Sequence, residues 1–179
     1  MIEKKIDVIV VGASAAGMAC AKYLVDAGQV VLLLEASQRI GQGTNGKTEK
    51  LRQSIESRGG EILTNVAVIK LRPGLSGRGF HIKTKFNYIH AHYVVLAINP
   101  SNAKHLLQMP RWHQAGLYQI YQSDSNPARN SAHGRQTAKA VLRDKQAATS
   151  SLAKSTVWSN RYLGKWPAPH QQLHKQSHQ

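Results

Sequence analysis

Two glycines and one acid near the start of the chain have the types and spacing needed to bind a nucleotide. Gly12 and Gly17 enclose four small residues, Ala13, Ser14, Ala15 and Ala16. In the pattern G-x-G-x-x-G the first glycine allows a tight turn, and the last lets a helix pack closely on a strand. Amide groups at the start of that helix face a pyrophosphate. Glu35 follows about twenty residues later, where an acid accepts hydrogen bonds from a ribose.

Ser14 stands where this pattern has its middle glycine. Its Cβ occupies space at the point where the backbone normally approaches the phosphate most closely. Serine is the least disruptive replacement, because its hydroxyl can itself donate to a phosphate oxygen. We therefore expect Ser14 to belong to the phosphate site.

Three elements must position these residues. A short apolar, β-branched run typical of a buried parallel strand consists of Ile6, Val8, Ile9, Val10 and Val11. Ala15–Ala27 is predicted to form a helix that Gly28 ends, and Val30–Leu34 a second buried strand that leads into Glu35. Strand, turn, helix, strand and terminal acid together predict a nucleotide-binding βαβ unit. A βαβ unit that binds no nucleotide is the alternative.

Residues 6–46 resemble the N-terminal FAD-binding segment of the flavin-containing amine oxidase superfamily, which includes monoamine and polyamine oxidases, protoporphyrinogen oxidase and phytoene desaturase. Residues 35–44, EASQRIGQGT, are similar to the family's E-A-x-x-R-x-G-G-R-x-x-T. Gln42 and Gly43 depart from it, so the second arginine is missing. The resemblance implies that FAD is the cofactor and that Gly12–Gly17, Glu35, Ala36 and Arg39 contact it.

A second block carries the same resemblance. Residues 59–71 are similar to the family's G-G-x-I-x-x-N-x-x-V-x-x-I, which implies that Val68 lies against the adenine. Residues 79–100 are similar to the small antiparallel unit and the strand that follows it. The two blocks together span about residues 5–115.

The remaining patterns complete the expected fold. Thr48–Arg58 has a narrow apolar stripe typical of a helix, and Glu61–Leu71 is typical of two strands joined by a turn. Further segments are predicted as two strands, Phe80–Phe86 and Tyr93–Ile98, and a short helix, 102–110. The predicted fold class is α/β: a Rossmann-like FAD/NAD(P)-binding domain with a parallel sheet and a small antiparallel β unit.

Charge and composition divide the chain into two parts. The net charge is +15, with 13 Lys/Arg against 7 Asp/Glu in residues 1–100 and 11 against 2 in residues 101–179. Residues 122–156 contain few large apolar side chains and are expected to be disordered or weakly helical. We therefore expect an FAD-binding domain over residues 1–120, lacking most of the family's substrate domain, and a basic, disordered tail over residues 121–179.

The resemblance implies an oxidoreductase that oxidises an amine or related substrate with flavin as the hydride acceptor. Only about twenty residues separate the two blocks, where the family has much of its substrate domain, and its flavin-closing C-terminal segment is not identifiable. No catalytic residue is therefore assigned, and a partner chain can be needed to supply the missing half. The alternatives are a truncated, non-catalytic FAD or nucleotide binder, or a basic-tailed nucleic-acid-binding module.

Other chemistry receives less support from the sequence. Cys20 is the only cysteine and is expected to be a buried apolar residue. His170, His174 and His178 share a helical spacing but are not expected to bind a metal, and His90 and His92 are expected on a solvated strand face. Aromatic and basic residues interleave near the chain end in a manner that suits single-stranded nucleic acid: Trp158, Arg161, Tyr162, Lys165 and Trp166. Without a signal peptide or membrane span, a cytoplasmic location is expected.

Overall fold

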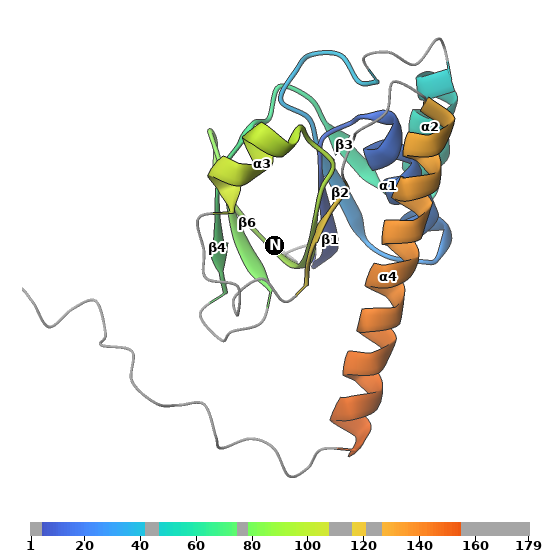
Figure 1. Cartoon of the computed structure of the whole chain (residues 1–179), viewed down its shortest axis with the longest axis vertical. Helices are drawn as coiled ribbons and strands as arrows, with labels where there is room; N and C mark the ends of the chain where they lie inside the picture. Colours follow the sequence, from blue (N-terminus) through green and yellow to red (C-terminus); the bar gives the residue numbers. More distant parts are fainter. Residues whose placement is uncertain (1–4, 42–46, 75–78, 108–115, 121–126, 155–179) are drawn as a thin grey trace, which may run out of the picture. The chain divides into compact units, whose positions relative to one another are not determined.

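The computed structural model describes residues 5–41, 47–74, 79–107, 116–120 and 127–154 (Figure 1). The chain divides into two compact units, residues 1–145 and 146–179. All the described residues belong to the first unit, apart from residues 146–154. The elements, in chain order, are β1 (Ile6–Val11), α1 (Ala15–Asp26), β2 (Val31–Leu34), α2 (Lys47–Glu56), β3 (Glu61–Leu63), β4 (Val68–Pro73), β5 (Phe80–Thr84), β6 (Tyr88–Leu96), α3 (Pro100–Leu106), β7 (Leu117–Gln119) and α4 (Pro127–Lys154).

One mixed sheet contains all the strands, in the order β3-β2-β1-β6-β5-β4, with β7 paired to β6. The pairs β2–β3, β1–β2, β1–β6 and β6–β7 are parallel, whereas β4–β5 and β5–β6 are antiparallel. Strand β6 joins the two parts: residues 88–91 pair with β5, and residues 94–96 pair with β7. The fold is therefore a Rossmann-like α/β fold with an antiparallel unit, as predicted.

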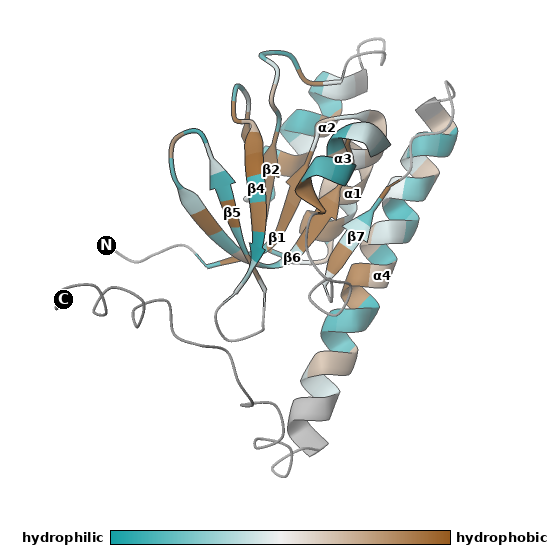
Figure 2. Ribbon diagram, turned by 60° about the vertical axis from the view of Figure 1, so that its left-hand side comes forward, coloured by the Kyte–Doolittle hydropathy of each residue, from teal (hydrophilic) through white to brown (hydrophobic). Residues whose placement is uncertain are grey.

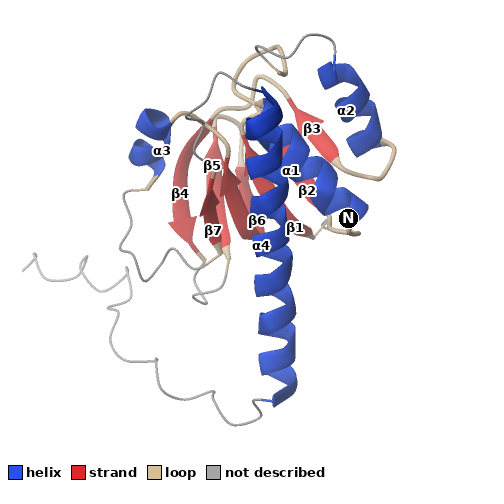
Figure 3. Ribbon diagram, turned by 45° about the vertical axis from the view of Figure 1, so that its right-hand side comes forward, coloured by secondary structure: helices blue, strands red, loops and turns tan. Residues whose placement is uncertain are grey.

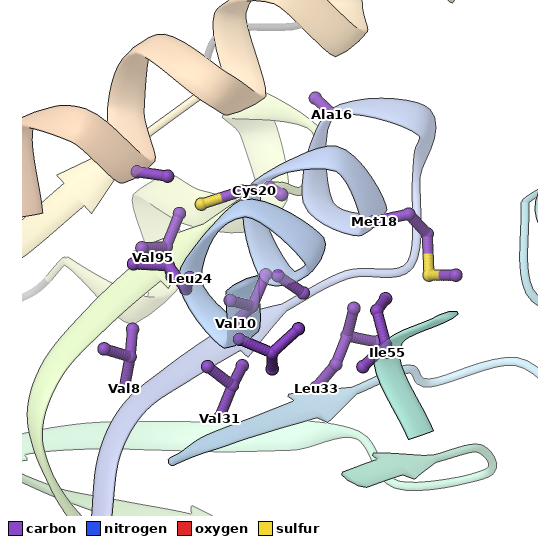
Figure 4. Packing of buried hydrophobic residues seen from close by; sticks show 14 of the residues in the cluster. Val8, Val10, Ala16, Met18, Cys20, Leu24, Val31, Leu33, Ile55 and Val95 are labelled. Carbon is purple, nitrogen blue, oxygen red and sulfur yellow. The ribbon is translucent and has the colours of Figure 1, made fainter. Parts of the chain in front are cut away.

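Side chains of β1 alternate between two cores. Val8 and Val10, both 0% exposed, point into a cluster with α1 residues such as Met18, Cys20 and Leu24 (Figure 4). Ile9 and Val11 belong to a second cluster, which includes Leu71 of β4. Full burial of such a side chain stabilises the fold by about 1.5–3 kcal/mol relative to exposure. Burial on both faces explains the unbroken apolar run in the sequence.

Different elements cover the two faces of the parallel sheet. Helices α1 and α4 lie side by side on one face (Figure 3). On the other, the cluster combines residues of the antiparallel strands with Ala103 and Leu106 of α3. Asn99 caps α3 by accepting a hydrogen bond from the Ser101 amide at 3.0 Å, and Pro100 occupies the first turn. The helix therefore begins at Pro100, before the predicted start at residue 102.

The main correction concerns the predicted tail. The expectation of a domain ending at residue 120 and a disordered segment from 121 differs from the structure, in which residues 127–154 form the helix α4. Ala138 and Val141 are fully buried against the face that carries α1. Few large side chains are needed there, because the helices approach closely and small residues fill the interface. Composition therefore underestimated the surface that this segment buries.

The other element predictions agree with the structure within a few residues at each end, with two exceptions. Strand β6 begins at Tyr88, five residues before the predicted Tyr93, and β7 was not predicted. The aromatic and histidine residues noted between 158 and 178 lie outside the described residues. In the described part of the chain, no helix is both long and apolar enough to cross a bilayer.

Candidate functional site

The tight turn after β1 depends on Gly12. Its φ of +102° lies in a region that L side chains rarely adopt. A Cβ at this position would be 2.6 Å from the Ala97 carbonyl oxygen and 2.8 Å from Cγ2 of Ile98, just beyond β6. Two adjacent parallel strands, β1 and β6, thus end with their backbones in close approach. Only glycine fits this turn without moving the end of β6.

Gly17 brings α1 directly onto this turn. A Cβ on Gly17 would lie 2.0 Å from the Gly12 carbonyl oxygen and 3.1 Å from Cβ of Ala97. The contacted atom is backbone, which cannot rotate away as a flexible side chain can. The two glycines predicted from their spacing therefore have the structural roles expected of the first and last glycines in G-x-G-x-x-G.

Ser14 is the N-cap of α1. Its Oγ accepts a hydrogen bond from the Gly17 amide at 3.2 Å and donates one to the Ala97 carbonyl oxygen at 3.1 Å. The hydroxyl has a single proton, and that proton is used in the bond to Ala97. The donation to a phosphate oxygen stays a prediction. In the structure the Ser14 hydroxyl links the start of α1 to the backbone just after β6.

Glu35, directly after β2, extends its carboxylate to the glycine turn. Oε2 accepts a hydrogen bond from the Ala13 amide at 2.6 Å. Oε1 accepts from the Ser37 amide at 2.9 Å and from Ser37 Oγ at 2.8 Å. A carboxylate offers about four lone-pair positions, so these three bonds leave the capacity for one further donor, such as a ribose hydroxyl. The acid and the turn are thus one connected site.

The backbone of neighbouring loops closes around this pair. The Gly41 amide donates to the Ala13 carbonyl oxygen at 2.9 Å, which fixes the far end of the loop that follows Glu35. The Asn65 amide donates to the Ser37 carbonyl oxygen at 3.1 Å, and the Val66 amide to the Glu35 carbonyl oxygen at 2.9 Å. Asn65 has a φ of +57°, a conformation that asparagine tolerates better than most residues. Segment 63–66 is therefore held beside the loop that contains Ser37.

The remaining predicted residues occupy the periphery of this arrangement. Ala15 and Ala16 form the first turn of α1, whose amide groups have no partner within the helix. Ala36 and Arg39 lie in the loop after β2 with exposed side chains. Val68 is the first residue of β4, is half-buried, and pairs with Thr84 of β5. Most of the glycine-rich loop after Gly41 falls outside the described residues.

The chemistry available at this edge is binding rather than proton transfer. Backbone amides at a helix start attract an anion, and a fixed carboxylate accepts hydrogen bonds from sugar hydroxyls. Cys20 is buried behind the site, and burial raises the pKa of its thiol to about 12, so it stays protonated near neutral pH. Among the residues that the structure describes, no group of His, Cys, Asp and Glu can hold a metal ion.

Sequence reasoning missed three contributors to the site. Ser37 holds the Glu35 carboxylate, and its position two residues after an acid is a recognisable signal for such a local bond. Ala97 supplies the carbonyl oxygen that Ser14 contacts, and nothing in its residue type indicates this. The third is α4, whose Gly134, Ala138 and Val141 recur at helical spacing on one face.

A second strand–helix unit, β7–α4, therefore accompanies the first. Strand β7 runs parallel to β6, so its carboxyl end lies at the same edge of the sheet as those of β1 and β2. A Cβ on Gly134 would lie 2.1 Å from the carbonyl oxygen of Ala16 in the first turn of α1. The start of α1 is thus supported from behind by the backbone of α4.

Comparisons with known proteins found similarity over parts of the chain. The sequence profile of the NAD(P)-binding Rossmann-like domain matches residues 10–64, from β1 to the end of β3. Thioredoxin reductase of Lactococcus lactis, in its FR conformation, is 22% identical with a TM-score of 0.47, over 53% of this chain and 36% of that chain. Thioredoxin reductase of T. acidophilum is 25% identical with a TM-score of 0.44, over 54% and 36% of the two chains.

An FAD-bound form of OTEMO is 15% identical with a TM-score of 0.46, and the match covers 53% of this chain and 26% of that chain. The match with the first of these solved structures spans only 36% of its length. No curated protein sequence matched the chain.

Proposed function

We propose that this chain binds FAD and forms the cofactor-binding part of a flavin-dependent oxidoreductase of amine oxidase type. One observation carries the proposal: the Glu35 carboxylate is hydrogen-bonded at 2.6 Å to the Ala13 amide of the glycine turn. A sugar-binding acid and a phosphate-binding turn are thus fixed together at the carboxyl edge of parallel strands, where such folds bind dinucleotides. The Rossmann-like sequence match over residues 10–64 supports the same cofactor class.

Each residue of the site has a distinct task in this proposal. The amides of Ala15 and Ala16 donate to the pyrophosphate, and Ser14 holds the turn beside it at the start of α1. Glu35 accepts from the adenosine ribose through Oε2. The backbone near Val68, in the segment that follows Val66, contacts the adenine, and Arg39 in its exposed loop adds positive charge beside the phosphates.

When bound, FAD supplies an isoalloxazine ring that accepts a hydride from an amine or related substrate. In this proposal the residues of this chain bind and orient the cofactor, and none of the described residues is assigned as a catalytic acid or base. Chemistry at the ring requires residues beyond the site described here.

A non-catalytic FAD or nucleotide binder is the second candidate. The observation that favours it is the short connection between Gly41 and Glu61, whose described part is occupied by α2 and the turn after it. That connection leaves little chain from which to build a substrate pocket. Binding without turnover, or turnover only with a partner chain that supplies the missing half, is the outcome this candidate predicts.

The test is a titration of the purified full chain with FAD, followed by quenching of flavin fluorescence and by the visible spectrum. ADP serves as a second probe, because it contains the adenosine and diphosphate but no flavin. We expect saturable binding of both. We expect Gly12→Val to abolish it. We expect Glu35→Gln to weaken it by roughly tenfold, because the charged carboxylate acceptor is replaced by a neutral amide.

Gly59→Ala and Glu49→Gln are the matched controls. Gly59 also has a positive φ, of +82°, but a Cβ there would meet no atom within 4 Å, and Glu49 is an exposed acid on α2. Circular dichroism reports whether Gly12→Val still folds. The proposed site is wrong if the wild-type protein binds neither FAD nor ADP. It is also wrong if Glu35→Gln binds FAD as tightly as Glu49→Gln does. Reduction of bound flavin by candidate amines then separates the two candidates.

A further inference from the structure

The outer surface of the antiparallel unit is a basic face. We use this name for seven side chains of β4, β5 and β6: Lys70, Arg72, His81, Lys83, Tyr88, His90 and His92. Residues directly opposite in antiparallel strands point to the same side of the sheet. The register therefore aligns six of them in two rows across the strands, Arg72–His81–His90 and Lys70–Lys83–Tyr88. The His92 ring lies 5.7 Å from that of His90.

The opposite side of the same strands is apolar and buried. The alternate row, Leu71–Ile82–Ile89, belongs to the core that α3 covers, and Ile82 is 0% exposed. The alternation of hydrophilic and hydrophobic residues along β4 and β5 is visible in Figure 2. The polar side of the unit is thus the side that is turned away from this core.

Charge of a single sign dominates this region. The sequence from Ile62 to Ser123 contains no aspartate or glutamate, although it includes seven lysines and arginines. Exposed sheet faces normally mix both signs, and like charges directly opposite each other destabilise a sheet. Lys70 and Lys83 form such a pair, and the His81 and His90 rings lie 5.0 Å apart. The Asp7 carboxylate adds negative charge near His92 at the edge of this face. It is hydrogen-bonded to Lys145 Nζ at 2.9 Å, so its charge is partly compensated.

Exposed aromatic rings interrupt the positive charge. Tyr88 is 61% exposed, and Phe86, in the turn before it, is 69% exposed. Lys83 Nζ lies 5.7 Å from the centre of the Tyr88 ring. Rings beside cations on an open strand surface can stack with bases while the cations neutralise phosphates. A membrane surface would also attract the positive charge, and binding to it is one outcome of the test below.

We propose that the basic face binds single-stranded nucleic acid, with Lys70, Arg72 and Lys83 contacting phosphates and Tyr88 and Phe86 stacking on bases. The basic face uses the first part of β6, whereas the glycine turn contacts the residues that follow the end of this strand. It also differs from the aromatic and basic segment near the chain end that the sequence indicated.

The test is a fluorescence anisotropy titration of the full chain with a labelled oligothymidylate over a range of salt concentrations. The double variant Lys70→Gln/Lys83→Gln should weaken binding at least tenfold. It should also reduce the salt slope of log Kd by about 1.4, because each phosphate of a single strand that a lysine neutralises accounts for about 0.7 of the slope. Tyr88→Ala should weaken binding about tenfold, whereas Tyr88→Phe should bind nearly as the wild type does.

The control variant Lys50→Gln/Lys104→Gln removes two exposed lysines from α2 and α3 and should leave binding almost unchanged. Thermal unfolding should show that Lys70→Gln/Lys83→Gln is at least as stable as the wild type, because a like-charge pair is removed. Equal reductions in affinity in the two double variants would refute a dedicated face. Binding to vesicles of phosphatidylserine and phosphatidylcholine without binding to the oligonucleotide would assign the face to a membrane instead.

Discussion

The strand–helix units β1–α1 and β7–α4 share one construction but differ in how it is encoded. In each, a parallel strand ends at the same edge of the sheet and a helix follows on the same face. Each helix makes a close approach through a glycine: Gly17 to the Gly12 carbonyl oxygen and Gly134 to that of Ala16. The first helix packs on the turn that follows its own strand, whereas the second packs on the first helix. Tight backbone packing is thus used once for a candidate ligand site and once to support it.

The largest effect should come from disrupting the approach of Gly17. Gly17→Ala places a Cβ 2.0 Å from the Gly12 carbonyl oxygen, and we expect a decrease of about 3 kcal/mol in the free energy of unfolding. Alanine normally stabilises a helix interior by about 1 kcal/mol relative to glycine, so the sign itself is informative. Urea unfolding gives the value. A neutral or stabilising result would mean that α1 can move away from the turn.

Disrupting the approach of Gly134 should cost less. Gly134→Ala places a Cβ 2.1 Å from the Ala16 carbonyl oxygen, but α4 can shift without disturbing a hydrogen-bonded turn. We expect a decrease of about 1–2 kcal/mol in the free energy of unfolding, with helix propensity offsetting part of the clash. FAD affinity should fall only slightly. A larger decrease than that of Gly17→Ala would reverse the assignment of the supporting role to α4.

The smallest effect should come from the polar interactions that fix α4. Lys145 Nζ donates to Asp7 Oδ1 at 2.9 Å and to Gln29 Oε1 at 2.5 Å. Burial alone would raise the pKa of Asp7, but the hydrogen bonds from Lys145 and the Val30 amide outweigh it, so the pKa lies below 3.8. A carboxyl with a lowered native pKa stabilises the fold above its unfolded pKa and loses that contribution as pH falls through the native value.

Lys145→Met should therefore destabilise the protein by about 0.5–1 kcal/mol at neutral pH, a modest value because both partners are partly exposed. The difference from the wild type should shrink as the pH falls below 3.8. Unfolding curves recorded between acid and neutral pH give this profile. A difference that stays constant with pH would show that the ion pair is not its source.

The same two units show what could be predicted from sequence. Val8–Val11 is an unbroken β-branched run, and Gly12, Gly17 and Glu35 carry local signals, so strand, turn, helix and acid were all predicted. In α4 the buried residues are Gly134, Ala138 and Val141, which are small and stand among exposed polar neighbours. Their burial depends on a partner helix distant in sequence. A hydrophobic pattern read along one segment does not contain that information.

The interactions of the candidate site also fall into those that the sequence indicates and those that it does not. Bonds between residues close in sequence, such as Ser37 with Glu35, can be predicted from the residue types and their spacing. The bond from Ser14 to the Ala97 carbonyl oxygen cannot, because any residue can supply a carbonyl. The phosphate contact of Ser14 stays a prediction, whereas the backbone partner of its hydroxyl, just after β6, could not be predicted from the residues around it.

The packing of α4 on α1 also has a consequence for the order in which the chain folds during synthesis. Lys145 and Asp7 are 138 residues apart, and the buried residues of α4 stand near the end of the first compact unit. While these residues are still within the ribosome, β1, α1 and β2 can pair, but their outer face stays in contact with water. Contacts between residues so distant in sequence form slowly. Until α4 packs, the apolar surface of α1 and the sheet remains exposed and can bind chaperones.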